Sequence, residues 1–518
     1  MNETYDIAVV GSGFGGSLLA MIAHRLGRSV MLLEKNKHPR FAIGESSTPL
    51  SNILLESLAT RYDLPSIAPL SKWGSWQQNY PHVACGLKRG FTFYHHMLGA
   101  PATSDPNRQL QLLVAASPHD RIADTHWYRA ELDHLFVKEA QTIGVHYLDE
   151  VTLPSVSESD TEFRLQGRRN NENFSVRAKF VVDATGPRGF LHHALALQES
   201  PLPDFPATQA LFSHFTGVAR FAEQISDHAS ELPPYPVDDA AVHHIFDGGW
   251  IWVLQFNNGI TSAGVAATDQ LAARLRLSEG PAAWQRLLDL IPALKNQFAN
   301  SQATRPFTYM PRTSFRSNSV AGKRWALLPS AAGFVDPLLS TGFPLTLLGV
   351  SRLAEMIERD WEKPEFAASL QSYASQTDNE LVAAAGLIGA LYATMDRFPT
   401  FASLSMLYFA AASFSEAARR LGKRHLAPSF LLHDDPHFGP AMRRCCERAT
   451  NNCAKLGIDN LADEVYKVIE PINIAGLSNP NRRNWYPVDA NDLLNSAAKL
   501  KSTKHQVSQL LDRCGFWK

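Results

Sequence analysis

Apolar residues near the start of the chain occur in two short unbroken runs, separated by a longer helical segment. Residues 5–10 and 28–33 are typical of buried strands. Residues 17–26 lie between these runs and are mostly apolar, as the helix of a βαβ unit is. Farther on, residues 126–143 carry apolar side chains at helical spacing and predict an amphipathic helix.

The middle of the chain predicts strands, and the last third predicts helices. Residues 145–184 alternate in short runs bounded by turn residues, as in an antiparallel meander, and residues 208–268 contain further strand-like runs. From residue 347 onward the pattern is mainly helical. Residues 101–124 are polar and predict a loop. These patterns together predict an α/β protein.

Charge and composition exclude several classes of protein. Of 518 residues, 49 are Lys or Arg and 50 are Asp or Glu, which gives a formal net charge of −1. This balance argues against binding to nucleic acid or to a charged membrane surface. The longest apolar stretch, residues 381–395, is shorter than the roughly 20 residues that span a membrane. We therefore expect no nucleic-acid partner and no membrane association.

The five cysteines show no pairing pattern and no CxxC motif. A reduced, cytoplasmic location is therefore expected. Cys445, Cys446 and Cys453 lie close together in the sequence, but no local histidine completes a set of four metal ligands. The expectation is that the chain holds no metal.

A glycine-rich turn follows the first predicted strand. Gly11, Gly13 and Gly16 fit the pattern G-x-G-x-x-G, and Glu34 ends the second strand about 20 residues later. Glycine at these positions permits a tight turn, close approach of a pyrophosphate and close packing of helix on strand. The helix N-terminus then faces the phosphates, and Glu34 accepts hydrogen bonds from a ribose. A dinucleotide site is the favoured interpretation; the alternative is a glycine-rich turn beside an ordinary surface glutamate.

Two later segments favour FAD over NAD as the dinucleotide. Residues 181–186 form a strand that enters an Ala-Thr-Gly turn, where a long cofactor could lie across the sheet. Residues 333–342 form a glycine-bounded loop that enters a helix, and its backbone N–H groups suit an anion or an electron-rich ring. The sequence has no second G-x-G-x-x-G motif for a separate NADPH domain. A reductant is therefore expected as reduced flavin or through transient contact with NADPH.

Residues 40–49, RFAIGESSTP, change the interpretation. Together with the glycine motif they resemble the flavin-dependent halogenases, which belong to the FAD monooxygenases with a p-hydroxybenzoate-hydroxylase-like fold. Residues 85–93, 243–252 and 328–342 are similar to further segments of that family. The resemblance extends from residue 5 to about residue 348. It looks closest to halogenases that act on free phenols such as phloroglucinol.

The resemblance implies a particular domain organisation. A Rossmann-like FAD-binding domain would be interleaved with an antiparallel-sheet substrate domain and followed by a helical C-terminal region. We expect the first two within residues 1–350, with the substrate sheet at about 75–125 and 190–310. The helical region is expected at residues 351–518.

The resemblance also implies a reaction. In the family, reduced FAD, O2 and a halide, chloride or bromide, generate hypohalous acid, which travels through a tunnel to a lysine. That lysine holds the halogen as a haloamine or by a hydrogen bond until the aromatic ring attacks it. Lys88 corresponds to this lysine and Ser340 to a second catalytic residue. A solvated lysine and a helix N-cap serine are the alternatives.

The remaining site residues follow from the same comparison. Thr341 and Gly342 are implied to bind halide through backbone N–H groups at a helix start. Trp250 and Trp252 lie two apart on one predicted strand, so they face the same side; they would form the tunnel wall or simply be core residues. For Arg129 the alternative is a helix-surface ion pair with the residue at i+4. The cofactor contacts implied are Gly11, Gly13, Phe14, Gly15, Gly16, Glu34, Lys35, Arg40, Ser46, Arg129, Asp183, Gly186, Asp336 and Gly342.

Two positions depart from the family pattern. Gln255 replaces the proline of a W-x-W-x-I-P signature, which keeps a related FAD monooxygenase or oxidoreductase without halogenation as an alternative. Leu339 stands where tryptophan halogenases carry a glutamate, which favours a phenolic substrate. The implied partners are a separate flavin reductase and a small aromatic substrate, either free or bound to a carrier. The C-terminal helices would cover the substrate entrance or form a homodimer face.

Overall fold

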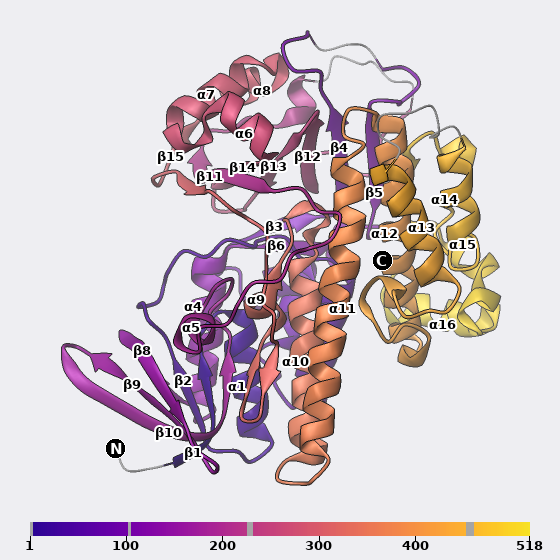
Figure 1. Ribbon diagram of the computed structural model, residues 1–518. Coiled ribbons are helices and arrows are strands. Elements are labelled where there is room, and N and C mark those ends of the chain that lie inside the picture. The colour runs from indigo at the N-terminus through magenta and orange to yellow at the C-terminus, as the bar shows by residue number, and fades with distance from the viewer. Residues whose placement is uncertain (1–3, 102–104, 225–230, 452–459, 518) are drawn as a thin grey trace.

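The first sheet is built around the N-terminal βαβ unit. The computed structural model describes residues 4–101, 105–224, 231–451 and 460–517, so Cys453 lies outside the described residues. Strands β1 (Thr4–Val10) and β2 (Val30–Leu33) are parallel and are joined through helix α1 (Phe14–Arg25). The sheet has eight strands, in the order β18-β19-β10-β1-β2-β7 with β9 and β8 attached to β10, and lies in the lower part of Figure 1. Its other strands are β7 (His146–Leu148), β8 (Val151–Glu158), β9 (Phe163–Arg169), β10 (Glu172–Asp183), β18 (Ala321–Gly322) and β19 (Trp325–Leu327).

A second, nine-stranded sheet forms the upper part of the molecule in Figure 1. Its order is β15-β11-β14-β13-β12-β4-β5-β21, with β16 beside β11, and most neighbours are antiparallel. One face packs against helices α6 (Asp269–Leu275), α7 (Pro281–Asp289) and α8 (Pro292–Gln297). The strands are β4 (Gly90–His95), β5 (Gln111–Ala115), β11 (Thr208–Thr216), β12 (Ala241–Phe246), β13 (Gly249–Gln255), β14 (Thr261–Thr268), β15 (Gln302–Ala303), β16 (Thr308–Met310) and β21 (Trp485–Tyr486).

The expectation of a continuous loop at residues 101–124 is wrong. Strand β5 lies within this segment, where the apolar residues Leu112, Leu113 and Val114 are buried between polar flanks. Strand β6 (Asp124–Trp127) begins at its end and pairs with β3 (Cys85–Lys88) as a separate two-stranded sheet. The surrounding polar residues concealed a strand whose buried part is only three residues long.

Most of the remaining chain is helical. The described helices are α2 (Pro49–Arg61), α3 (Trp73–Asn79), α4 (Arg129–Thr142), α5 (Phe190–Ala194), α9 (Pro329–Ala332), α10 (Gly342–Asp360), α11 (Phe366–Tyr392), α12 (Phe398–Arg420), α13 (Phe438–Asn451), α14 (Leu461–Ile469), α15 (Ala490–Asn495) and α16 (Lys504–Arg513). A two-stranded sheet joins β17 (Phe315–Arg316) to β20 (Gly333–Phe334).

Within the described ranges no helix is both long and apolar enough to span a membrane. The α/β fold, with its Rossmann-like sheet and helical C-terminal region, is confirmed. The exact domain limits stay a prediction, since β21 adds a C-terminal strand to the second sheet.

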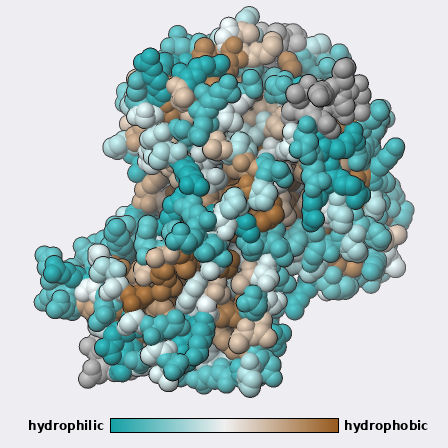
Figure 2. All heavy atoms as spheres, in the orientation of Figure 1, coloured by the Kyte–Doolittle hydropathy of each residue, from teal (hydrophilic) through white to brown (hydrophobic). Residues whose placement is uncertain are grey.

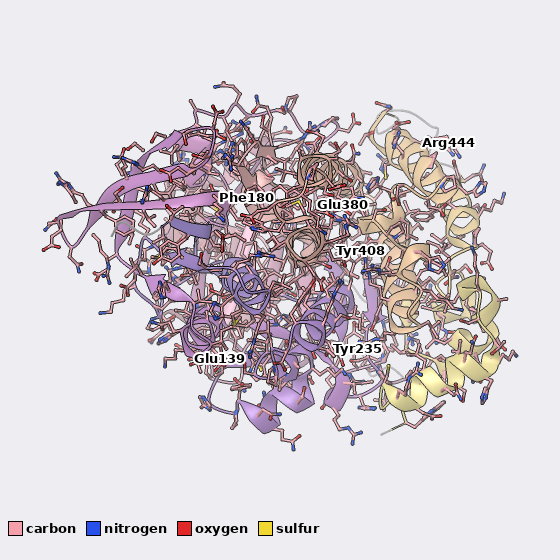
Figure 3. The ribbon with its side chains drawn as sticks, turned by 90° about the horizontal axis from the view of Figure 1, so that it is seen from below. Glu139, Phe180, Tyr235, Glu380, Tyr408 and Arg444 are labelled. Carbon is pink, nitrogen blue, oxygen red and sulfur yellow. The ribbon has the colours of Figure 1, made fainter. Side chains whose placement is uncertain are left out.

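A buried ion pair fastens the C-terminal helices to the rest of the molecule. Glu380 on α11 is fully buried and accepts hydrogen bonds from Arg352 of α10 at 2.7 and 2.5 Å. The same carboxylate accepts the backbone N–H of Phe430 at 2.8 Å. In Figure 3 Glu380 lies in the interior, whereas Arg444 lies at the outer rim. Because three segments share one buried carboxylate, α10 and α11 are held in fixed relation to the chain that follows α12.

The face of the molecule in Figure 2 is mainly hydrophilic, with hydrophobic atoms showing in the recess between the upper and lower parts.

A second buried carboxyl, Asp336, connects the nine-stranded sheet to α11. Its Oδ1 accepts hydrogen bonds from the indole N–H of Trp250 at 3.2 Å and from the backbone N–H of Leu338 at 3.0 Å. Its Oδ2 accepts the hydroxyl of Tyr392 at 2.9 Å. Burial raises the pKa of Asp336 to about 7, although the three hydrogen bonds oppose the rise. The carboxyl therefore fixes the segment that leads into α10 while being costly to ionise.

This raised pKa makes the stability of the fold depend on pH. Between pH about 4 and 7, Asp336 binds more protons in the native protein than in the unfolded chain. Its contribution to the free energy of unfolding is therefore full below this window and is lost as the pH rises through it. Asp336→Asn imitates the neutral carboxyl. Between pH 5 and 7, we expect the free energy of unfolding to fall by on the order of 2 kcal/mol more in the wild type than in this variant. Urea unfolding of both proteins across this range measures the difference.

Asp160→Asn serves as the matched control, because the Asp160 side chain is almost fully exposed. It should follow the wild-type pH profile. Parallel profiles for Asp336→Asn and the wild type would contradict the assignment of a raised pKa to Asp336.

Candidate active site

The glycine turn at the start of α1 requires the residues that occupy it. Gly11 has φ +101°, and a Cβ there would lie 2.6 Å from the carbonyl carbon of Ala184 at the end of β10. A Cβ on Gly16 would lie 2.0 Å from the carbonyl oxygen of Gly11. Any side chain at either position would therefore separate α1 from the strands. The close packing expected from the motif is present.

Glu34 lies against this turn. Its Oε2 accepts hydrogen bonds from the backbone N–H of Ser12 at 3.1 Å, from the Ser12 hydroxyl at 2.9 Å and from Arg40 Nη2 at 2.9 Å. Burial raises the pKa of Glu34, but Arg40 and backbone N–H groups more than offset this and hold it below its usual range. The neighbouring Lys35 is exposed at the end of β2. Of the two residues, Glu34 is the one held beside the glycine turn.

The space above Gly13 suits an anionic group. A Cβ at Gly13 would lie 3.3 Å from Arg129 Nη2, 3.7 Å from Asp133 Oδ2 and 3.8 Å from Arg40 Nη2, so two guanidinium groups and one carboxylate face the turn and its net charge is positive. Arg40 Nε is buried and has no hydrogen-bond partner among the described residues. A buried donor without an acceptor is costly, and the N-terminus of α1 favours negative charge. These features fit the pyrophosphate of FAD.

Arg129 forms the ion pair that was the alternative to a cofactor contact, but the pair is buried. Its Nε and Nη2 each donate to Asp133 at 2.8 Å, and its Nη1 donates to the backbone carbonyls of Ile43 and Gly44 at 3.2 and 3.0 Å. The residue is 7% exposed. Arg129 therefore ties α4 to residues 40–49, and a direct cofactor contact stays a prediction.

Other predicted cofactor residues contribute to packing around the turn. The ring of Phe14 makes edge contacts with Trp127 and Phe343 at centroid distances of 5.2 and 4.9 Å. A Cβ on Gly15 would lie 2.8 Å from Thr346 on α10, so this glycine permits close helix packing. Asp183 accepts the backbone N–H and hydroxyl of the threonine in the Ala-Thr-Gly turn. The Gly186 that ends the turn has φ +87° and open space beside it.

Lys88 is completely buried at the end of β3. Its Nζ donates to Ser46 Oγ at 2.9 Å and to the carbonyl oxygen of Ser47 at 2.5 Å, and it lies 3.9 Å from the centre of the Phe91 ring. The solvated-lysine alternative is therefore wrong. Ser46 and Ser47 belong to the RFAIGESSTP segment, so the Lys88 amine is hydrogen-bonded directly to that segment.

Lys88 faces Asp124 across the β3–β6 pair. Burial lowers the pKa of the Lys88 ammonium to about 7, and the nearby Asp124 charge opposes this shift. Burial likewise raises the pKa of Asp124 to about 7, and Lys88 opposes that rise. Burial thus favours the neutral form of both groups, while the charge of each favours the ionised form of the other. An amine whose ammonium pKa is lowered in this way loses its proton more readily than a solvated lysine.

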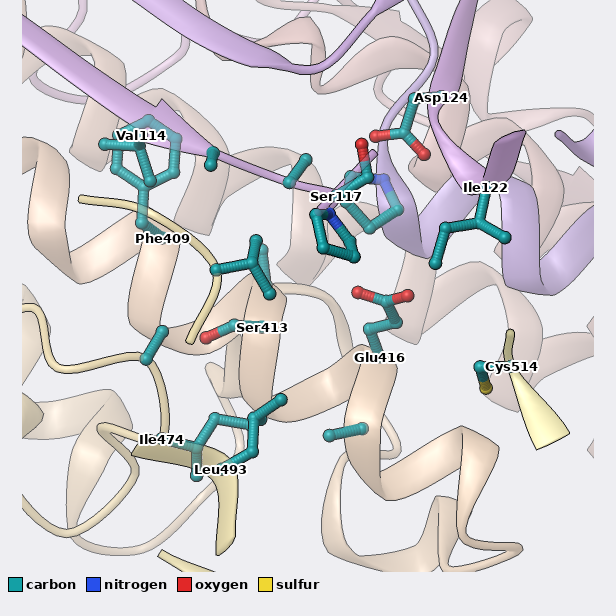
Figure 4. A pocket seen from close by; sticks show the side chains of 18 of the residues that line it. Val114, Ser117, Ile122, Asp124, Phe409, Ser413, Glu416, Ile474, Leu493 and Cys514 are labelled. Atoms are coloured by element: carbon teal, nitrogen blue, oxygen red, sulfur yellow. The ribbon is translucent and has the colours of Figure 1, made fainter. Parts of the chain in front are cut away.

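A cavity of about 180 Å³ lies beside this pair. Phe91, Asp124 and Asn52 line it from the N-terminal half of the chain. The opposite wall comes from α12, which contributes Tyr408 and Glu416, and from residues 474–516. Figure 4 shows Val114 on β5 and Phe409 on α12 among the side chains that line the cavity. The C-terminal region therefore covers the space next to Asp124, which pairs with Lys88 across β3 and β6.

A continuous row of aromatic rings runs from the tryptophan pair to this cavity. Trp250 and Trp252 contact each other at 5.7 Å between ring centroids, which confirms that they share one side of β13. The ring of His243 lies 5.2 Å from Trp250 and 4.5 Å from Phe93. Phe93 in turn stacks on Phe91, which lines the cavity. Burial lowers the pKa of His243 to about 3, so this ring is neutral.

The loop before α10 has unusual backbone geometry. Leu339 and Ser340 have φ +60° and +55°, in the left-handed region that non-glycine residues rarely adopt. Such strain is found at functional sites. Thr341 is 3% exposed and Gly342 begins the 19-residue helix α10. The side chain of Ser340 does not cap the helix, so the N-cap alternative is wrong. The described hydrogen bonds of Lys88 reach Ser46 and Ser47 but not this loop.

Sequence reasoning missed three parts of the site. Asp124 lay at the edge of a segment interpreted as a loop, and only its pairing with Lys88 reveals its position. Glu45, in the RFAIGESSTP segment, accepts a hydrogen bond through Oε1 from Nε2 of buried His214 at 2.8 Å, and the two are 169 residues apart. The α12 wall had an apolar helical pattern but no chemical motif. No local sequence pattern identifies any of these three features.

Comparison with known proteins agrees with the geometry. The family model described as tryptophan halogenase matches residues 123–401. Tetracycline 7-halogenase of Kitasatospora aureofaciens is 29% identical over 390 residues, which cover 74% of this chain and 68% of the relative. The monodechloroaminopyrrolnitrin halogenase PrnC of Pseudomonas fluorescens is 26% identical over 73% of this chain and 66%, just under two thirds, of the relative.

Solved structures give the same result. The crystal structure of the halogenase PltM superposes with a TM-score of 0.82 at 25% identity and covers 93% of this chain and 99% of its own. The flavin-dependent halogenase CmlS shares the fold, with a TM-score of 0.58 at 19% identity over 90% of this chain and 77% of its own. Because the family model alone spans more than half of the residues, the chain belongs to the tryptophan halogenase family of flavin-dependent halogenases.

Proposed function

We propose that this flavin-dependent halogenase installs chloride or bromide on an electron-rich, phenolic small molecule, and that Lys88 delivers the halogen. The observation that carries the proposal is the position of the Lys88 amine. It is fully buried, held by Ser46 and Ser47 of the motif segment, and next to Phe91 and Asp124, which line the cavity. Lys88 thus connects the predicted flavin side of the site with the space for a substrate.

The glycine turn, Glu34 and Arg40 would hold FAD through its ribose and pyrophosphate. When bound, reduced FAD supplies the electrons with which O2 and halide become hypohalous acid. The strained loop at Leu339 and Ser340 directs the start of α10, and backbone N–H groups of Thr341 and Gly342 would bind the halide there. Trp250 and Trp252 would form a wall of the passage toward Lys88.

Lys88 either reacts with hypohalous acid, forming an N–halogen bond and releasing water, or holds the acid by a hydrogen bond. Both require a primary amine whose proton is exchangeable near neutral pH, and burial provides that condition. The aromatic ring then attacks the halogen. Ser46 and the Ser47 carbonyl keep the amine oriented while this occurs.

The size of the cavity supports a small phenolic substrate. A cavity of about 150 Å³ suffices to hold benzene in another protein, and this one measures about 180 Å³. PltM, whose overall fold is similar, has been crystallised in complex with phloroglucinol and FAD. Other relatives act on pyrrole attached to a peptidyl-carrier protein, so a carrier-bound substrate is a distinct outcome to test. Reduced flavin would come from a separate flavin reductase, since the sequence has one glycine-rich dinucleotide motif.

Replacing Lys88 tests the delivery step. Lys88→Met keeps the length of the buried side chain and removes the amine. With FAD, a flavin reductase, NADH, O2 and bromide, halogenation of a panel of phenols should fall at least about 100-fold. Mass spectrometry of the products detects the halogen isotope pattern, and flavin fluorescence shows that FAD binding is retained.

Lys323→Met is the control, because Lys323 is an exposed lysine that forms an ion pair with Asp160 and does not line the cavity. It should retain activity. If Lys88→Met kept more than about a tenth of the wild-type rate, Lys88 would not be the delivering residue. An oxygen-containing product without halogen would favour a monooxygenase.

Replacing Arg40 tests the cofactor site. Arg40→Met removes the unpartnered buried donor and one charge from the space above Gly13. The Kd for FAD should rise at least tenfold, or about 1.4 kcal/mol, because a charged hydrogen bond to phosphate is lost. Fluorescence titration with FAD measures the change. Lys37→Met, at an exposed neighbouring position, should bind FAD like the wild type, and an equal Kd for both variants would refute the Arg40 assignment.

A further inference from the structure

Asp124 has one carboxylate oxygen that the protein does not use. Its Oδ1 accepts a hydrogen bond from the side-chain amide of Asn52 at 2.6 Å. Its Oδ2 is buried and has no hydrogen-bond partner among the described residues. Asp124 is only 6% exposed, and a buried polar atom without a partner is destabilising. The unused oxygen belongs to a side chain that lines the cavity beside Lys88.

The other two carboxyl groups that line the cavity differ in this respect. Glu416 on α12 is paired with Arg420, whose Nε lies 2.8 Å from Glu416 Oε1. Asp489 is paired with Arg482 and accepts the backbone N–H of Asn491. Figure 4 shows Asp124 and Glu416 on opposite walls of the cavity. The rest of the lining includes apolar groups such as Val114 and Phe409, which suit the faces of an aromatic ring. Among the described residues, Asn52 Oδ1 and Ser117 Oγ of the same lining also lack a partner, so Asp124 Oδ2 belongs to a group of three unpartnered oxygens and is the one that comes from a carboxyl.

We propose that Asp124 is the catalytic base of this halogenase: Oδ2 accepts the hydroxyl proton of a single-ring phenol bound between β5 and α12. This inference rests on the proposed function and makes it more specific. A single ring in this cavity of about 180 Å³ that donates one hydroxyl to Asp124 lies next to the residue that pairs with Lys88 across β3 and β6.

The proton transfer has a direct chemical purpose. When the phenol O–H bond breaks, the proton moves to Asp124 Oδ2 and the electron pair stays on oxygen, which makes the ring a stronger nucleophile. The ring carbon then forms a bond to the halogen held at Lys88 as the N–halogen or O–halogen bond breaks. The displaced nitrogen or oxygen takes the ring proton, and the phenolic oxygen recovers its proton from Asp124. Asp124 is therefore regenerated in each cycle.

The surroundings of Asp124 are consistent with this role. Burial raises its pKa to about 7, Lys88 on β3 opposes the rise, and Glu416 on α12 adds to it, while Asn52 and Arg420 oppose it. Tyr408 is also within electrostatic reach, and burial raises its pKa, so that ring stays neutral. A base is most effective when its pKa lies near the working pH.

Two matched substrates distinguish a base from a residue that only positions Lys88. 3,5-Dimethoxyphenol and 1,3,5-trimethoxybenzene are both activated rings, and only the first has an acidic proton. In Asp124→Asn, bromination of the phenol should fall about 100-fold, whereas that of the ether should change less than about threefold. Asp160→Asn, at an almost fully exposed position, should leave the ratio of the two rates unchanged. An equal loss for both substrates in Asp124→Asn would mean that Asp124 acts only through Lys88, and an unchanged phenol rate would exclude any role.

A binding measurement separates this inference from the proposed function. Phloroglucinol and 1,3,5-trifluorobenzene have similar shapes, but only phloroglucinol donates hydrogen bonds. Calorimetry with the wild-type protein should give a Kd at least tenfold lower for phloroglucinol, and Asp124→Asn should reduce that preference. If the preference holds but no halogenated product forms, the proposed function fails and the phenol site stands. If the wild type shows no preference, the phenol site is refuted whatever its activity.

Discussion

Burying one ammonium group inside the protein is the constraint around which this site is organised. An isolated charge in such a place would be strongly destabilising, so Lys88 is surrounded by Ser46, the Ser47 carbonyl, the face of Phe91 and Asp124. These four partners come from three elements: the motif segment supplies two, and β4 and β6 supply one each. The local arrangement of the site is therefore a consequence of solvating a single amine with protein groups.

The same principle explains the other buried acids. Glu380 joins α10 and α11 by accepting from Arg352, and Asp336 joins β13, α11 and the loop before α10 by accepting from Trp250, Tyr392 and Leu338. Both use polar groups in the interior to fix the relative position of elements that hydrophobic packing alone would allow to slide. The strained loop at Leu339 and Ser340 starts directly after Asp336, so its geometry is supported from both sides.

The N-terminal βαβ unit and its glycine turn could be predicted from sequence because their signals are local: two apolar runs, three glycines and one acid at fixed spacing. The shared side of Trp250 and Trp252 follows equally from strand geometry. The facing of Lys88 and Asp124 could not be predicted, since it depends on the register between two strands 36 positions apart along the chain. Nor could the cavity wall on α12, because an apolar helical pattern does not tell which neighbour it covers.

The cavity is assembled from parts of the chain that are far apart in sequence. Phe91 and Asp124 line it from the N-terminal half, and Tyr408, Glu416 and residues 474–516 line it from the C-terminal region. Lys88 itself comes from β3, so the amine and the C-terminal wall are encoded in separate stretches of sequence. Substitutions on the C-terminal wall can change the shape of the cavity while Lys88 stays the same. The range of substrates that fit could thereby change without any change in the amine.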